Sequence, residues 1–443
     1  MSLGANKQAL MGAAGAGGAA DDFYTHQIAK SARFTGSGKL SRTAGTPTNI
    51  DKFTISFWVK RSDVTAHNNL VFGDTDNSNY QMLRFSSTEL LELHEQRGAG
   101  DSNGLRTIRQ VFRDPETWYH IVWVYDSGNS TETNREIFYL NGERLTNVEG
   151  WDGGYPAQNR DSVFNQSGAT QVIGGASAYY GNYLSGYMAE VVFNDGQVYA
   201  ASDYGETKNE VWIPKDPSGL TFGNNGFYLD FANSSAMGND VSGNNNDFTA
   251  SNVDTHDQML DSPTFGSSNG GNFATWNILS RTNPALSYGA STFSEGNLAF
   301  AGDTGGTAST GSTFSMQSGK WYAEIMQSGS PAGGWPAVGV IYTDKMGTAQ
   351  GTSNIQPQNG FTAFIAMTNG NLYKFDASSG ASYGSAFGNG DICNIAVDID
   401  AGKIWWGKNG TYFASGNPAT GANAGDTFTA GTTLSLWVAG YNG

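Results

Sequence analysis

Short runs of alternating apolar and polar residues, separated by turn residues, make up most of the chain and predict β-strands. Residues 53–60 (FTISFWVK) are a clear example, with apolar side chains at every second position. Since successive side chains of a strand point to opposite faces, we expect a half-buried strand whose polar face carries Thr54, Ser56 and Lys60.

Other runs add to this β-rich pattern in the first half of the chain. Residues 118–125 (WYHIVWVY) are apolar on both faces, as in an interior strand of a sandwich. Residues 136–140 (EIFYL) lead into Asn141-Gly142, a strong signal for a two-residue hairpin turn. Only residues 202–209 offer a short helical periodicity, so the block is predicted to be almost entirely β.

A second β-rich block occupies the C-terminal third. Residues 320–326 (KWYAEIM) and 392–399 (ICNIAVDI) read as strands, and residues 403–408 (KIWWGK) end at the turn Asn409-Gly410. Trp405 and Trp406 are adjacent, so at least one of them must face the core. The spacing of strands and turns predicts an antiparallel sandwich.

The segments outside these blocks differ in composition. Residues 1–30 begin with a Gly/Ala-rich stretch, which we interpret as a flexible docking arm rather than a signal peptide. Residues 233–285 are rich in Asn, Ser and Gly and predict an ordered, irregular linker. A few apolar residues are expected to fix that linker to the domain surfaces: Met259, Leu260, Phe265, Phe273, Trp276 and Leu279. The predicted domains are therefore residues 31–232 and 286–443.

Amino-acid composition and net charge exclude some classes of function. Gly is abundant at 60 residues, and aromatic residues make up 13% of the chain against 14% charged residues, which suits packed strands joined by tight turns. The formal net charge of −16 disfavours nucleic acid as a partner. No apolar run is long enough to insert in a membrane. The single cysteine, Cys393, excludes an intrachain disulfide and is expected to be a buried apolar residue.

The first block resembles the laminin-G/pentraxin-like branch of the concanavalin A-like jelly rolls. The resemblance rests on FTISFWVKR, WYHIVWVYD, IFYLNGE, VIGG and GYMAEVVFNDG, and on the order and spacing of these pieces between residues 31 and 231. It implies a lectin-like β-sandwich.

The second block resembles a SPRY domain, itself a bent β-sandwich, through GKWYAEI, VGVI and above all GDICNIAVDIDAGKIWWGKNG. SPRY domains of this type continue past a segment like LSLWVAGYNG into one more strand, whereas this sequence stops at Gly443. We expect the sequence to continue in a longer protein; the alternative is a strand supplied by a neighbouring molecule.

Three further segments look like parts of large structural proteins of marine bacteriophages, often described as tail fibres: residues 22–34, 225–264 and 272–277. This resemblance implies a virion surface protein made in the host cytoplasm. Its partners would be other virion proteins, contacted by the N-terminal arm, and further copies of itself, with a trimer favoured.

Motifs for catalysis are not found. Glycosidases of jelly-roll fold need paired carboxylates on one strand face, and the nearest run is Glu89, Glu92 and Glu95 in ELLELHE. Their spacing of three suits a short helical turn or a loop instead. His120, inside an aromatic strand, is expected to be packed or hydrogen-bonded rather than a metal ligand. The chain is therefore predicted not to be an enzyme.

Candidate binding residues fall into two classes. Calcium is a more plausible cofactor than zinc, because Asp and Asn oxygens suit it and the histidines have no metal-ligand spacing. The alternative is Asx-turn chemistry in the same loops. The calcium candidates are Asp74, Asp76 and Asn77 in one loop and Asp240, Asn244, Asn246 and Asp247 in another. The glycan-binding candidates are aromatic residues in Gly-rich loops, which otherwise cap a core edge or an interface: Trp151, Tyr155, Tyr179, Tyr180, Tyr183 and Trp335.

The sequence thus predicts an all-β protein of two tandem, lectin-like jelly-roll sandwiches on a bacteriophage particle. Its expected role is host attachment through a cell-surface polysaccharide. The alternative is a structural capsid fibre or decoration protein that uses the two folds as spacers.

Overall fold

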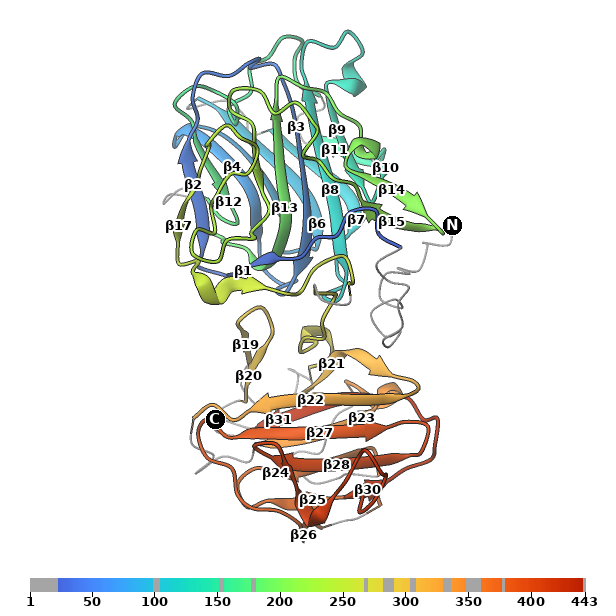
Figure 1. Cartoon of the computed structure of the whole chain (residues 1–443). Helices are drawn as coiled ribbons and strands as arrows, with labels where there is room; N and C mark the ends of the chain where they lie inside the picture. Colours follow the sequence, from blue (N-terminus) through green and yellow to red (C-terminus); the bar gives the residue numbers. More distant parts are fainter. Residues whose placement is uncertain are drawn as a thin grey trace. The chain divides into compact units, whose positions relative to one another are not determined.

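The computed structural model describes residues 23–98, 104–150, 155–176, 181–266, 270–281, 291–302, 308–329, 336–347, 360–376 and 379–440. Two compact units divide the chain between Phe273 and Ala274 (Figure 1). Both are built from antiparallel strands, so the prediction of an all-β fold is confirmed. None of the helical turns in these ranges is long and apolar enough to cross a bilayer.

The first unit is a sandwich of two eight-stranded sheets. Sheet A contains, in spatial order, β10 (Glu143–Arg144), β9 (Glu136–Leu140), β8 (Trp118–Asp126), β3 (Lys52–Arg61), β13 (Ser185–Asp195), β1 (Ser31–Thr35) and β18 (Gln258–Met259), with β16 (Phe227–Leu229) also on β13. Sheet B contains β11 (Val148–Gly150), β7 (Gly104–Val111), β6 (Leu90–Arg97), β5 (Asn79–Phe85), β4 (Asn68–Asp76), β12 (Thr170–Ile173), β2 (Lys39–Thr43) and β17 (Thr249–Ser251).

The core of the first unit lies between the two sheets. Phe53, Phe57 and Trp123 from sheet A and Leu83 and Leu93 from sheet B belong to one fully buried apolar cluster. Aromatic rings pack there edge to face and in parallel, which adds to the stabilisation from their buried area. The turn at Asn141-Gly142 has positive φ at both residues, as the hairpin prediction requires.

The outer face of sheet A is also covered, which corrects the prediction of a half-buried strand at residues 53–60. Every residue of β3 from Phe53 to Arg61 is buried. The hairpin β14 (Gly205–Lys208)–β15 (Val211–Pro214) packs on this face through Trp212. The short helix suggested by the periodicity of residues 202–209 is not formed. A single helical turn, η3 (Ala201–Asp203), ends there and is followed by strand β14.

A strap formed by residues 258–266 and 270–273 completes this cover and buries a charge. The Lys60 ammonium group lies 2.8 Å from Asp261 Oδ2 and donates to Asn272 Oδ1 and the Phe273 carbonyl, at 2.8 and 2.9 Å. The Lys60 side chain is only 1% exposed. Trp118 Nε1 donates to the other Asp261 oxygen at 2.9 Å, so the strap is fixed to two strands of sheet A.

The apolar residues predicted to fix residues 233–285 divide into two groups. Trp276 is buried in the second unit, while Met259 and Phe265 pack partly buried on the first. Leu260, Phe273 and Leu279 are exposed, so the expectation was wrong for these three. Polar bonds such as Lys60–Asp261, rather than these side chains, hold the strap in place.

Within the predicted N-terminal arm, residues 1–22 lie outside the described residues. Tyr24 and Ile28 are buried on the first unit, and His26 pairs with Glu190 at 2.5 Å. Among the described residues of the first unit, the helical turns are η2 (Glu132–Asn134), η3 and η4 (Thr255–Asp257).

The second unit packs a six-stranded sheet against a five-stranded one. The six-stranded sheet contains β21 (Ala308–Met316), β31 (Leu434–Gly440), β23 (Ala337–Tyr342), β24 (Thr362–Ala366), β25 (Asn371–Tyr373) and β26 (Ala381–Ser382). The five-stranded sheet contains β22 (Lys320–Met326), β27 (Ile392–Asp398), β28 (Lys403–Lys408) and β29 (Thr411–Tyr412), with β30 (Asp426–Thr427) also on β28. The remaining elements are the hairpin β19 (Thr292–Ser294)–β20 (Ala299–Ala301) and the turns η5 (Ile278–Ser280), η6 (Thr343–Lys345) and η7 (Phe413–Ser415).

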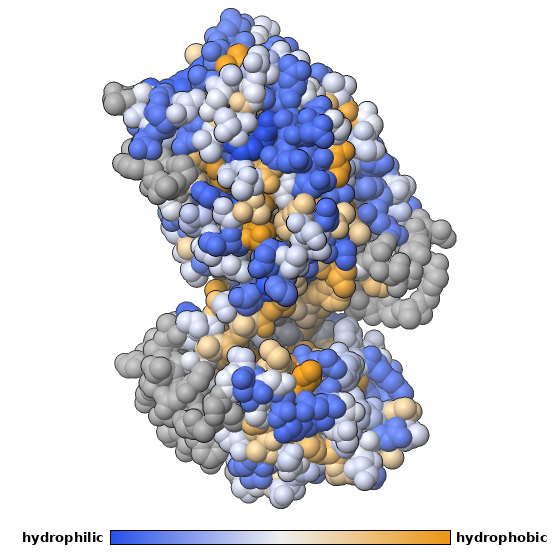
Figure 2. All heavy atoms as spheres, turned by 60° about the vertical axis from the view of Figure 1, so that its left-hand side comes forward, coloured by the Kyte–Doolittle hydropathy of each residue, from blue (hydrophilic) through white to orange (hydrophobic). Residues whose placement is uncertain are grey.

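The core of the second unit confirms two single-residue predictions. Trp405 and Trp406 are both buried, and Trp405 Nε1 donates to the Ala422 carbonyl at 2.8 Å. Cys393 is fully buried, and burial raises the pKa of its thiol. Asn409 and Gly410 have positive φ at the predicted turn. On the side drawn in Figure 2, hydrophilic residues cover most of the first unit, and hydrophobic ones are scattered among them.

Candidate functional site

Several predicted site residues gather at one end of the first sandwich, where β3 begins and where β8 and β13 end. We call it the Asp195 end, because the buried Asp195 carboxylate holds its loops together. It accepts hydrogen bonds from Thr48 N at 2.6 Å, Asn49 N at 3.3 Å, Asn165 Nδ2 at 2.7 Å and Asn225 N at 3.0 Å. One side chain thereby fixes three loops that lie far apart in the sequence.

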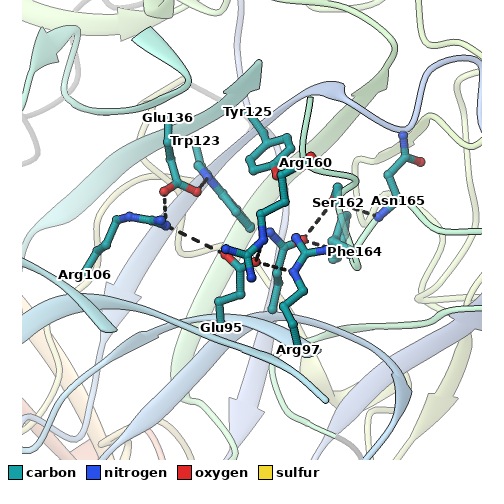
Figure 3. Close-up of polar contacts among 11 residues, drawn as sticks. Glu95, Arg97, Arg106, Trp123, Tyr125, Glu136, Arg160, Ser162, Phe164 and Asn165 are labelled. Atoms are coloured by element: carbon teal, nitrogen blue, oxygen red, sulfur yellow. Dashed lines mark hydrogen bonds and ion pairs between the residues drawn. The ribbon is translucent and has the colours of Figure 1, made fainter. Parts of the chain in front are cut away.

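Beneath these loops lies a network of carboxylates and arginines between the two sheets (Figure 3). Arg106 of β7 bonds to Glu136 of β9, and the same nitrogen lies 3.9 Å from Glu95 Oε2 on β6. Trp123 Nε1 donates to the second Glu136 oxygen at 3.1 Å. The network therefore links sheet A to sheet B through charged groups inside the sandwich.

Arginines also close the network on the solvent side. Arg97 bonds to Glu95, and Arg160 Nε lies 3.5 Å from the same carboxylate oxygen. The Arg160 side chain is 34% exposed, so it connects the buried charges to the surface. The Arg160 carbonyl accepts a bond of 2.7 Å from the Tyr125 hydroxyl, which fixes this part of the loop.

Burial raises the pKa of the Glu136 carboxyl to about 7, although the Arg106 guanidinium acts in the opposite direction. A carboxyl of raised pKa can serve as a general acid, but Glu136 is fully enclosed and already bound to Arg106 and Trp123. The pair Glu95/Glu136 shares one guanidinium instead of flanking a space for a sugar. This arrangement suits a rigid frame for the loops above it.

Residues 90–95 of the run ELLELHE lie in strand β6, which corrects the expectation of a helical turn or loop there, whereas Glu89 lies in the turn that precedes the strand. Each of its three glutamates has a different arginine partner. Glu89 lies 2.6 Å from Arg113 and Glu92 lies 3.0 Å from Arg84, while Glu95 joins the buried network. As the spacing implied, Glu92 and Glu95 fall on opposite faces of the strand.

His120 has the packed role predicted for it. It is buried in sheet A, where its Nε2 lies 2.8 Å from Ser56 Oγ and its Nδ1 accepts a bond of 3.0 Å from Trp212 Nε1. Burial lowers the pKa of the ring to about 3, so the imidazole is neutral at physiological pH.

The first calcium candidate loop follows the Asx-turn alternative. Asp74 is buried within β4 rather than in the loop, and Asn77 is exposed. Asp76 accepts bonds from Ser78 N at 2.7 Å and from the Asn79 amide at 2.8 Å. These bonds lower the pKa of the Asp76 carboxyl without any cation.

The second calcium candidate loop is more tightly bonded. Asp240 Oδ1 accepts from Tyr228 N and Ser242 N, at 2.8 and 2.9 Å. Its Oδ2 accepts from Ser242 Oγ and Asn246 N, at 2.9 and 2.8 Å. The Asp240 carboxylate is thus filled by protein donors and does not fit a calcium ion.

The neighbouring candidates of that loop fix backbone. Asn244 and Asn246 each donate to the Gly226 carbonyl, at 2.9 and 2.8 Å, and Asp247 Oδ1 accepts from Asp240 N at 2.8 Å. Across the described residues, no three His, Cys, Asp or Glu side chains are arranged to hold a metal.

The aromatic candidates fall at opposite ends of the sandwich. Tyr155 is half-buried in the loop that leads to Arg160, at the Asp195 end. Tyr183 is half-buried at the other end, in the loop where Asn69 N bonds to the Asn182 carbonyl at 3.0 Å. The other four candidates lie outside the described residues: Trp151, Tyr179, Tyr180 and Trp335.

Inspection of the sequence missed the Glu95–Arg106–Glu136 network. The available signal was a charge at an inward position of a strand, such as Glu136 at the start of EIFYL. A charge buried between apolar neighbours needs a partner of opposite charge, but the sequence does not say which strand supplies it.

Family models match both units in the expected order. Residues 34–201 match the model described as the concanavalin A-like lectin/glucanases superfamily, of the laminin-G type. Residues 320–430 match the SPRY domain. The chain carries a laminin-G-type domain followed by a SPRY domain. No curated protein matches the chain in sequence.

Solved structures with related folds are distant in sequence. A putative carbohydrate-binding protein from Bacteroides ovatus is 17% identical with a TM-score of 0.34, and the match covers 52% of this chain and 59% of that protein. The SPRY domain of human HERC1 is 18% identical with a TM-score of 0.25, covering 31% of this chain and 76% of that domain.

Mouse laminin α1 domains LG4-5 are 9% identical with a TM-score of 0.32, covering 94% of this chain and 82% of that structure. Because the chain spans only 59% of the Bacteroides protein, part of that protein has no counterpart here. Similarities this distant assign no ligand or partner to this chain.

Proposed function

We propose that this chain is a non-enzymatic surface protein of a bacteriophage particle that attaches to a host polysaccharide. The laminin-G-type domain would bind the glycan at its Asp195 end. The observation that carries the proposal is the position of Tyr155 at the start of the loop whose Asn165 is bonded to the Asp195 carboxylate. Aromatic rings on loops held by a rigid scaffold are the usual means of binding sugars.

The carboxylate–arginine network favours binding over cleavage. Glu95 and Glu136 are both engaged by Arg106, and Glu136 is fully buried. A glycosidase needs one carboxyl to donate a proton to the glycosidic oxygen and another facing the sugar ring. Neither carboxyl is in that position, so the chain is proposed to hold a polysaccharide without cutting it.

The particle context of the proposal rests on sequence resemblance. Segments 22–34, 225–264 and 272–277 look like those of phage structural proteins. The N-terminal arm would contact other virion proteins, and several copies would stand together on the particle. A net charge of −16 suits neither nucleic acid nor an acidic membrane surface as a partner.

Glycan binding is tested with the full chain on an array of bacterial surface polysaccharides. Trp151→Ala and Tyr155→Ala should each weaken binding by about tenfold, because a stacked aromatic ring is worth roughly 1 kcal/mol or more. Tyr183→Ala is the matched control, since Tyr183 lies at the opposite end and its removal should leave binding unchanged. Equal losses in all three variants, or no binding to any polysaccharide, would contradict the proposed site.

The particle location is tested by labelling the chain in purified virions with an antibody and imaging by electron microscopy. Label at the tail together with glycan binding supports attachment. Label on the capsid without glycan binding supports the alternative, a decoration protein that uses both domains as spacers.

A further inference from the structure

Strand β22 of the SPRY domain is an edge strand with no neighbour on one side. It ends the five-stranded sheet and pairs only with β27, from Lys320↔Asp398 to Met326↔Ile392. Figure 1 shows β22, β27 and β28 side by side in this order. Among the described residues, none supplies a backbone partner on the other side of β22.

Flanking bonds reveal which backbone groups point to the free side. Gln327 exchanges bonds with Asp391 and Gly390 at 2.9 and 2.8 Å, and the Gly319 carbonyl accepts from Ile399 N at 2.9 Å. Odd-numbered residues therefore face β27, because bonding direction alternates along an antiparallel strand. The N–H and C=O groups of Lys320, Tyr322, Glu324 and Met326 face outward.

Apart from the charges of Lys320 and Glu324, the edge lacks the features that normally prevent strand pairing. Its register with β27 is continuous, so it has no bulge, and its sequence KWYAEIM contains neither Pro nor Gly. Its outer face shows two large side chains, Tyr322 at 57% and Met326 at 62% exposure. A flat, seven-residue edge of this kind is suited to accept another strand.

We propose that β22 pairs antiparallel with β22 of a second copy, about a two-fold axis at Ala323. In this register Tyr322 lies opposite Glu324 of the second copy, and Lys320 lies opposite Met326 of the second copy. All four outward-facing residues then occupy hydrogen-bonded positions. On the inner face, Trp321 meets Ile325 of the second copy, so the apolar layer continues across the axis.

Charge supports a second copy as the occupant. The chain carries a net charge of −16, so two copies repel each other over most of their surface. The edge β22 is balanced, with one lysine and one glutamate. In the proposed register no like charges are directly opposite each other. Each Lys320 is diagonal to Glu324 of the other copy, so two attractive diagonals outnumber the single repulsive diagonal between the two copies of Glu324.

The symmetry distinguishes this inference from the expected trimer. A two-fold contact joins copies in pairs, whereas a simple cyclic trimer has no two-fold axis. The inference concerns the SPRY domain alone and is independent of glycan binding by the laminin-G-type domain.

A cysteine cross-link tests the register. Ala323→Cys places two thiols opposite each other at a non-hydrogen-bonded pair, where Cα atoms are about 4.5 Å apart and a disulfide can close. Tyr322→Cys is the matched control, because the two copies of residue 322 are diagonal and beyond disulfide reach. The native Cys393 is buried and does not interfere. We expect a covalent dimer of the full chain from Ala323→Cys only; cross-linking by neither or by both variants overturns the register.

Charge variants test the contact without cross-linking. In the Tyr322→Glu variant, the glutamate at position 322 of each copy lies opposite Glu324 of the other copy. These two like-charge pairs should raise the dimer dissociation constant by about tenfold. Tyr322→Lys removes the same tyrosine but faces Glu324 of the second copy, so the dimer should persist. Both variants lose the same bonds to Glu324 and Asn394. The unfolding free energy of each variant is measured alongside, so that a difference in folding is separated from a difference in pairing.

Light scattering with size-exclusion chromatography of the full chain reads out both variants. A wild-type monomer at 50 µM or a trimer unaffected by Tyr322→Glu would overturn the proposal. Protection of the amides of residues 322 and 324 from hydrogen exchange in a monomer would do so as well, because another part of the same chain would then cover the edge.

Discussion

Strands β3 and β22 have the same alternating sequence pattern but opposite surroundings. In β3 both faces are buried, and Lys60 on the polar face is bound by the strap. In β22 the polar face remains exposed, so Tyr322, Glu324 and Met326 reach solvent. The alternation of apolar and polar residues therefore indicates which face of a strand is polar. Whether that face is exposed to solvent depends on segments elsewhere in the chain.

The largest expected loss of stability comes from breaking the buried ion pair between Lys60 and Asp261. Asp261→Ala leaves the Lys60 ammonium group buried and unpaired, which should lower the free energy of unfolding by about 3–5 kcal/mol. Urea unfolding measures this loss, and hydrogen exchange of β3 peptides assigns it to the laminin-G-type domain. Lys320→Ala on β22 is the control, because its ion pair with Asp398 is exposed and should contribute less than about 1 kcal/mol. Similar losses in both variants would remove the distinction between the two strands.

The next effect is a pH dependence confined to the laminin-G-type domain. Burial raises the pKa of Glu136 from 4.5 to about 7, so its contribution to stability is complete below pH 4.5 and is lost as pH rises through 7. The loss amounts to about 3 kcal/mol. Glu136→Gln cannot titrate, so this part of the pH slope should disappear. Unfolding measured from pH 4 to 8 checks it, and an unchanged slope would show that Glu136 stays ionised.

Two tryptophans provide a smaller contrast of the same kind. Trp118 Nε1 donates to the buried Asp261 carboxylate, while Trp321 Nε1 of β22 donates to the exposed Ser318 carbonyl at 2.7 Å. Trp118→Phe should cost about 2 kcal/mol, because the bond joins a buried charged group. Trp321→Phe should cost less than half of that, since water replaces the lost bond. Thermal unfolding of both variants measures the two losses of stability. A larger loss for Trp321→Phe than for Trp118→Phe would contradict this prediction.

The smallest effect is expected on the exposed face of β22. Tyr322→Thr keeps a strand-forming residue and removes an exposed bond to Glu324 and a partly buried one from Asn394. Because Asn394 Nδ2 also lies 3.3 Å from Glu324 Oε1, the unfolding free energy should change by less than about 0.5 kcal/mol. Calorimetry at low protein concentration, where copies remain separate, measures this value. A loss above about 2 kcal/mol would mean that this face is covered, as in β3.

Much of the fold follows from local patterns. Residues 118–125 are apolar on both faces and form the interior strand β8, and the Asn-Gly pairs form the predicted turns. The burial of β3 could not be predicted in this way. Its cover comes from Trp212 and Asp261, far along the chain, and no local pattern indicates that these residues return to the same face.

The candidate site was less accessible to prediction than the fold. Asn and Asp residues in loops suit both calcium and Asx turns, and the choice depends on which donors surround Asp240. The Arg106–Glu136 pair depends on the packing of sheet A on sheet B, which residue spacing does not determine. Aromatic loop residues such as Tyr155 could be nominated because their Gly-rich surroundings are visible locally.

The strap also determines how the laminin-G-type domain responds to force. The chain leaves that domain at Phe273, directly after the residues that bond to Lys60. Tension along the chain from residue 274 therefore loads the bonds between the strap and Lys60 of β3 before it loads the bonds between the strands of sheet A. Three bonds from one nitrogen share that load with the bond of 2.7 Å from Asn272 Nδ2 to the Glu116 carbonyl, which makes residues 258–266 and 270–273 a mechanical latch. Under pulling, we expect the latch to open before the sandwich of the laminin-G-type domain unfolds.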